Sequence, residues 1–133
     1  MSEPTRTYLA FDYGLKRVGV ASGNSMMRQA QPLRTIAAEG DARFNQIGRF
    51  IEEWQPDALV VGVPFHPDGA EHENTARARK FARQLQGRYH LPVHEVDERY
   101  STTEAQQAGG RDLDAESAAI ILQQFFNEHF AQS

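Results

Sequence analysis

The spacing of apolar and polar residues along the chain predicts several strands before it predicts any helix. Two short apolar runs, at 8–11 and 18–21, flank a turn that contains Gly14, a pattern typical of an antiparallel hairpin. A third strand is expected at 31–36, where Pro32 suits a sheet edge or a strand start better than a sheet centre. The continuous apolar run at 58–63 indicates a strand buried on both faces, as in a parallel sheet.

The rest of the chain carries helical spacing, interrupted by one more strand at 92–98. Helices are expected at 42–54, at 74–89, in a short segment that starts at Ser101–Glu104 and stops at Gly109–Gly110, and from Asp114 onward. Asp41 and Asp114 are favoured residues for helix N-caps, and Ser101–Glu104 has the spacing of a capping box.

This order of elements predicts an α/β fold. A hairpin start followed by parallel crossovers gives a mixed five-stranded sheet with helices on both faces. In such a sheet, the ends of the strands at 8–11 and 92–98 could lie side by side, with the start of the last helix over them. The length of 133 residues is that of a single domain, expected to span residues 1–133.

Composition narrows the possible chemistry. The absence of cysteine excludes disulfides, thiolate catalysis and zinc–thiolate sites. The four histidines before the last helix show no metal-ligand spacing, and His129 is expected at the edge of the apolar face of that helix. No apolar run is long enough to span a bilayer and the N-terminus lacks a signal-peptide layout, so a cytoplasmic protein without a membrane partner is expected. With a net charge of −4, any nucleic-acid partner must be held by a local basic face or through bound metal.

Acidic residues follow two of the predicted strands and open the last helix. The expected topology would gather Asp12, one of Asp97 and Glu98, and Asp114 at one edge of the sheet. Carboxylates without a nearby thiol or histidine cluster favour Mg²⁺ or Mn²⁺. A pair of such ions, about 3.5–4 Å apart, can hold both the attacking and the leaving oxygen of a phosphodiester. Taken singly, Asp12 is also an ordinary turn residue and Asp114 an ordinary N-cap.

Basic residues concentrate on the predicted helix at 74–89. No acidic residue occurs between positions 74 and 94, and the candidate phosphate-binding side chains there are Arg77, Arg79, Lys80 and Arg83. The alternative is a solvated helix face. The loop at 64–69 would lie at the carboxyl end of a buried strand, where open α/β sheets place ligands, or it is a simple turn.

Four segments in this order and spacing resemble the YqgF family. They are DYGLKRVGVA at 12–21, VVGVPFHPDGA at 60–70, DERYSTTEA at 97–105 and DAESAAIILQ at 114–123. The resemblance extends from about Tyr8 to Phe126. It implies a ribonuclease H-like fold and catalysis by acids that bind divalent metal. Members of this family are described as Holliday-junction resolvases and as nucleases for the 5′ end of pre-16S ribosomal RNA.

Position by position, the resemblance implies that Asp12, Glu98 and Asp114 are the catalytic, metal-binding acids. Asp97 is the alternate ligand, since neighbouring strand residues point to opposite faces. The further candidates for substrate contact are Lys16, Arg17, Asp68, Gly69 and Arg99, beside the four basic residues of the helix at 74–89. One departure concerns the segment 109–113, which is shorter and less basic than usual in the family and weakens the expected grip on substrate.

Three classes of function therefore remain open. The favoured class is a nuclease that uses Mg²⁺ or Mn²⁺ on structured RNA or branched DNA, as a monomer or weak homodimer. The second is a nucleotide binder, because actin-like ATPases share this fold and begin with Asp-x-Gly on the first hairpin; that function needs a second phosphate loop and a longer, two-lobed chain. The third is a non-catalytic adaptor in ribosome assembly or transcription.

Overall fold

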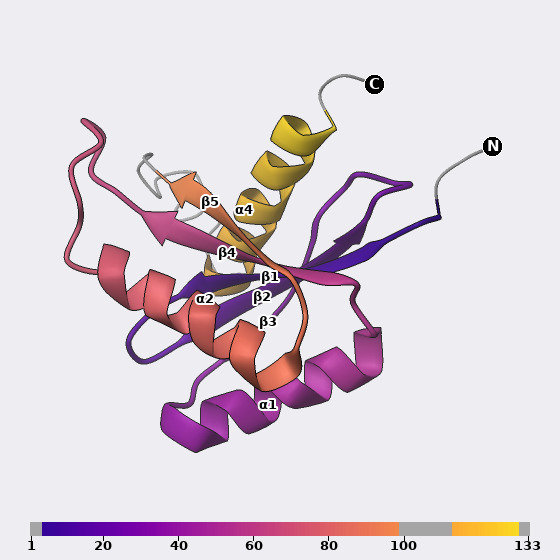
Figure 1. Cartoon of the computed structure of the whole chain (residues 1–133), viewed down its shortest axis with the longest axis horizontal. Coiled ribbons are helices and arrows are strands. Elements are labelled where there is room, and N and C mark those ends of the chain that lie inside the picture. Colours follow the sequence, from indigo (N-terminus) through magenta and orange to yellow (C-terminus); the bar gives the residue numbers. More distant parts are fainter. Residues whose placement is uncertain (1–3, 99–112, 131–133) are drawn as a thin grey trace.

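A mixed five-stranded sheet with the order β3-β2-β1-β4-β5 forms the centre of the molecule (Figure 1). The computed structural model describes residues 4–98 and 113–130. The strands are β1 (Thr7–Tyr13), β2 (Val18–Asn24), β3 (Gln31–Ile36), β4 (Ala58–Pro64) and β5 (Val93–Glu98). β1 and β2 form the antiparallel hairpin, β3 extends it at the edge, and β4 and β5 run parallel to β1. The predicted fold class, hairpin and edge position of Pro32 are confirmed.

Helices cover both faces of the sheet, as predicted. α1 (Gly40–Trp54) and α2 (Thr75–Tyr89) lie on one face, and α4 (Leu113–His129) lies on the other (Figure 1). None of the helices in the described part of the chain is long and apolar enough to cross a membrane. The predicted short helix at Ser101–Gly109, together with Arg99, lies outside the described residues.

Side chains of β1 alternate between the two apolar cores. Leu9 and Phe11 pack in the core under α1 and α2, whereas Tyr8 and Ala10 pack in the core under α4. Because successive strand residues point to opposite faces, Asp12 belongs to the α4 side, at the point where this core ends. The apolar alternation of β1 thus directs a single carboxylate toward the first turn of α4.

The sheet order corrects one prediction. β1 and β5 are not side by side, because β4 lies between them and pairs with both. β4 is fully apolar from Ala58 to Val63 and takes the position with a strand on each side, where both of its faces are covered. The carboxyl ends of β1, β4 and β5 still share one edge, since all three strands run in the same direction.

Both predicted helix caps are also displaced by a few residues. The N-cap of α1 is Glu39, and Asp41 lies in the first turn; Gly40, with φ of 60°, lets the chain enter the helix earlier than expected. Asp114 follows Leu113 within the first turn of α4. An acidic side chain in a first turn is still favoured, because it faces the positive end of the helix dipole.

Candidate functional site

Asp12 lies between two glycines in the sheet, Gly19 on β2 and Gly62 on β4. A Cβ atom on Gly19 would come within 1.8 Å of the Asp114 carbonyl oxygen. A Cβ atom on Gly62 would come within 3.2 Å of Glu98 Oε1 and even closer to a side chain of α4. The missing side chains therefore allow the first turn of α4 and the Glu98 carboxylate to approach Asp12 from either side.

The three predicted acids act on one another electrostatically. Glu98 is buried on the α4 side, with 9% of its surface exposed. The pKa of Asp12 is raised well above its usual value, first by burial and then by the negative charges of Glu98 and Asp114. Asp97 is exposed on the other side of β5, so the predicted placement of the two neighbouring acids on opposite faces of the strand is confirmed, and the choice of Glu98 as the ligand stays a prediction.

Asp114 already has a partner in the β1–β2 turn. Its Oδ2 lies 3.0 Å from Nε of Arg17, and the side chains are 30% and 64% exposed respectively. As the side chains stand, no group of three acidic or histidine residues among residues 4–98 and 113–130 is close enough to hold one metal ion. The donor chemistry nonetheless fits Mg²⁺ or Mn²⁺, because it is all oxygen. An ion shared by all three acids must compete with Arg17 for Asp114.

A buried arginine that the sequence analysis did not single out anchors this turn. Arg43 of α1 is only 5% exposed, although its position in the helix pattern is polar. Its Nη2 donates a hydrogen bond of 2.9 Å to the Leu15 carbonyl, and its Nε donates one of 2.8 Å to the Ala38 carbonyl. The guanidinium also lies 5.6 Å from the centre of the Tyr13 ring. The turn that carries Lys16 and Arg17 is thereby attached to the opposite helical layer.

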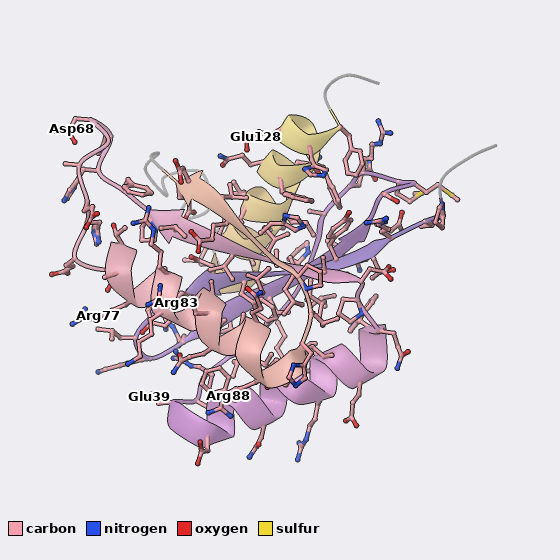
Figure 2. The ribbon with its side chains drawn as sticks, in the orientation of Figure 1. Glu39, Asp68, Arg77, Arg83, Arg88 and Glu128 are labelled. Carbon is pink, nitrogen blue, oxygen red and sulfur yellow. The ribbon has the colours of Figure 1, made fainter. Side chains whose placement is uncertain are left out.

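Asp68 and Gly69 shape the loop that follows β4. The Asp68 carboxylate accepts a hydrogen bond of 2.9 Å from the amide of Ala70, and Asp68 lies at the loop tip (Figure 2). Gly69 has φ of 91°, a conformation that favours glycine. The base of the loop adjoins the acids, because the amide of Phe65 donates to the Glu98 carbonyl over 2.8 Å. These contacts give Asp68 and Gly69 a role in shaping the loop. Their contact with substrate stays a prediction.

The basic residues of α2 are not equivalent. Arg79 forms ion pairs of 3.8 Å with both Glu71 and Glu95, which lie outside the acid-free part of the sequence. Lys80 and Arg83 are exposed on the helix, and Figure 2 shows Arg83 projecting outward from α2. α2 and the acids lie on opposite faces of the sheet, so a nucleic acid that touches both must pass around the edge where β4 and β5 end.

Sheet order, helical layers and acids at the carboxyl ends of the strands define the ribonuclease H-like class of α/β proteins. RuvC from T. thermophilus, solved in complex with a Holliday junction substrate, superposes with a TM-score of 0.53 at 14% identity, over 94% of this chain and 96% of that one. The chain belongs to the RuvX family: the family model, described as Holliday junction resolvase, matches residues 6–128. The expected YqgF membership is confirmed, since this is the same family.

Close relatives carry a second description. Proteins from Albidiferax ferrireducens and a Polaromonas species, each named "Putative pre-16S rRNA nuclease", are 70% and 66% identical over 120 residues. The matches cover 90% of this chain, and 77% and 87% of the two relatives. The family is thus one of nucleases and resolvases, by both its sequence model and its named members.

Proposed function

We propose that this protein is a divalent-metal-dependent nuclease that hydrolyses phosphodiester bonds at the 5′ end of pre-16S ribosomal RNA. The observation that carries the proposal is that Glu98 and the first turn of α4 approach Asp12 across the two glycines. The negative charges of Glu98 and Asp114 contribute to the raised pKa of Asp12, in agreement with this proximity. The choice of RNA rests on the names of relatives at 66–70% identity. We expect the protein to act in the cytoplasm as a monomer or weak homodimer.

Asp12, Glu98 and Asp114 would hold Mg²⁺ or Mn²⁺ in this proposal. The bound metal would supply an activated water and offset negative charge on the scissile phosphate. The protein supplies a fixed arrangement of carboxylates, because Asp12 and Glu98 stand at the ends of two strands of one rigid sheet. Arg17 is exposed beside Asp114. When metal replaces Arg17 as the partner of Asp114, the released guanidinium would be available to bind a phosphate oxygen of the substrate.

The test compares four acid variants in one cleavage assay. Asp12→Asn, Glu98→Gln and Asp114→Asn should each abolish cleavage of a pre-16S 5′-leader RNA, while the matched control Asp97→Asn keeps most of the activity. The unfolding temperature of each variant shows whether it is folded. Full activity in Asp12→Asn or Asp114→Asn would refute the proposed site. If Asp97→Asn is inactive and Glu98→Gln active, the ligand from β5 is Asp97.

A Holliday junction resolvase is the second candidate, because the family model carries that description. Incubating the protein with the leader RNA and with a four-way DNA junction, side by side and with Mn²⁺, separates the two substrates. A wild-type protein that binds RNA but cuts neither substrate would be an adaptor. Saturable binding of ATP without cleavage would indicate the nucleotide-binding class instead.

A further inference from the structure

A hollow of about 670 Å³ opens at the end of the molecule opposite the acids. The start of β1, the turn after β2 and the last turn of α4 meet there (Figure 1). With a rise of about 1.5 Å per residue, α4 separates this end from Asp114 by roughly 22 Å. Arg6, Arg28 and His129 line the hollow together with Tyr8 and Phe130, and no acidic residue of the described chain does. In a protein of net charge −4, this is an unusual concentration of cationic and aromatic groups.

Arg28 is held in this hollow by an unusual backbone. Its φ of 53° lies in the left-handed region, which costs free energy for a residue other than glycine. Gln123 of α4 holds the strained turn from both sides. Its Nε2 donates a hydrogen bond of 3.0 Å to the Arg28 carbonyl, and its Oε1 accepts one of 3.2 Å from the amide of Ala30. The conformation is therefore fixed by α4, the helix that Phe130 directly follows.

The Arg28 side chain completes a stacked pair. Its guanidinium lies 4.7 Å from the centre of the Phe130 ring, and its Nε donates to the Ser25 carbonyl over 3.2 Å. The amide of Arg6 is in turn fixed by the Ser25 hydroxyl, which accepts its hydrogen bond over 2.9 Å. The Arg28 guanidinium and the Phe130 ring are thus placed before any ligand arrives, so ordering them costs a ligand little entropy, whereas Arg6 is held through its backbone and its side chain is exposed.

We infer that this hollow binds a nucleotide of a single-stranded nucleic acid. Single strands are held by cations that follow the phosphates and by flat groups on which bases stack, and an arginine guanidinium plane serves as such a group. Here a base stacks on the Arg28–Phe130 pair while Arg6 meets the adjoining phosphate. The inference rests on the proposed function and deepens it. It adds an anchoring contact, a few nucleotides from the scissile bond, for an unpaired part of the substrate.

The experiment measures binding in the Asp12→Asn background, so that cleavage plays no part in the result. The probe is a fluorescently labelled single-stranded RNA of about ten nucleotides, within the ~4–16 that such sites commonly occupy. Arg28→Gly removes the cation and relieves the left-handed strain, so it separates binding from folding. Phe130→Ala removes the ring, and Phe130→Leu keeps apolar bulk without an aromatic face. Arg34→Gln, at an exposed position of β3 outside the hollow, removes the same single positive charge and is the control for net charge.

Arg28→Gly and Phe130→Ala are expected to weaken binding about fivefold or more, with unfolding temperatures near that of the parent. Arg6→Gln should flatten the salt dependence by about one unit of slope, because Arg6 is the residue placed at the phosphate. Phe130→Ala should leave the affinity for a blunt-ended RNA duplex unchanged, because its bases are paired and not free to stack on the ring. The inference is overturned if Arg34→Gln weakens binding as much as Arg28→Gly, or if neither hollow variant changes the affinity. Either result would leave the nuclease assignment, tested through the acids, intact.

Discussion

Replacing Asp12 with asparagine should stabilise the metal-free protein above acidic pH. Burial, and to a smaller extent the charges of Glu98 and Asp114, raise the pKa of Asp12 in the folded state above its value of about 3.9 in the unfolded chain. The folded protein then holds a proton that the unfolded chain releases, so stability falls as the pH rises from the unfolded pKa to the folded pKa. Above the folded pKa, the wild-type protein carries the full cost of a buried, repelled carboxylate, and the asparagine variant does not.

The size of this effect follows from linkage. Each unit of pKa elevation corresponds to about 1.4 kcal/mol, or roughly 3–8 °C in the unfolding temperature of a domain of this size. Thermal unfolding in chelator, recorded from pH 4 to pH 8, should show the two proteins converging near pH 4 and the asparagine variant unfolding at the higher temperature as the pH rises to 8. Asp68→Asn, which changes an acid at the exposed loop tip, should show no such separation. A destabilised Asp12→Asn protein at pH 8 would refute the assignment of Asp12 to a repulsive cluster.

Three further predictions concern packing, metal and substrate. Gly19→Ala should lower the free energy of unfolding by about 1–3 kcal/mol, because its Cβ would collide with the backbone of Asp114. The control Gly87→Ala in α2 should be stabilising, because its Cβ would meet no atom within 4 Å. Chemical denaturation measures both. Cleavage should require Mg²⁺ or Mn²⁺ and fail with Ca²⁺, which prefers longer bonds and more ligands; activity in excess chelator would contradict this. The double variant Lys80→Glu/Arg83→Glu should weaken nucleic-acid binding and reduce its salt slope; an unchanged slope would mean that this face only solvates the protein.

The secondary structure could be predicted because each element carries a clear period. The alternation in β1, the unbroken apolar run of β4 and the helical stripes of α1 and α2 each determine local conformation and the face that is buried. The order of β1, β4 and β5 was predicted incorrectly. Periodicity tells which face of a strand is buried and does not say which strand is its neighbour.

The acids could be proposed from the sequence, whereas the groups that position them could not. The roles of Gly19 and Gly62 depend on strand register, which places both beside Asp12 from different parts of the chain. Each glycine lies between two valines in an apolar strand. A glycine inside a strand often marks a close approach of another part of the chain, and this was the signal that the sequence offered. Likewise, Arg79 belonged to an acid-free stretch of sequence, yet its acidic partners come from the preceding loop and from β5.

Arg43 has a consequence for how the site can move. By hydrogen-bonding to the Leu15 carbonyl from α1, it braces the backbone beneath Arg17 from the far side of the sheet. If the proposed site holds an ion or a phosphate, we expect that ligand to draw Arg17 away from Asp114 by turning the Arg17 side chain, because the Leu15 carbonyl is held in place by Arg43. Exposed side chains change rotamer within picoseconds to nanoseconds, whereas loops rearrange more slowly. On the proposed function, binding of metal and substrate would then require a change of the Arg17 rotamer and no rearrangement of the β1–β2 turn.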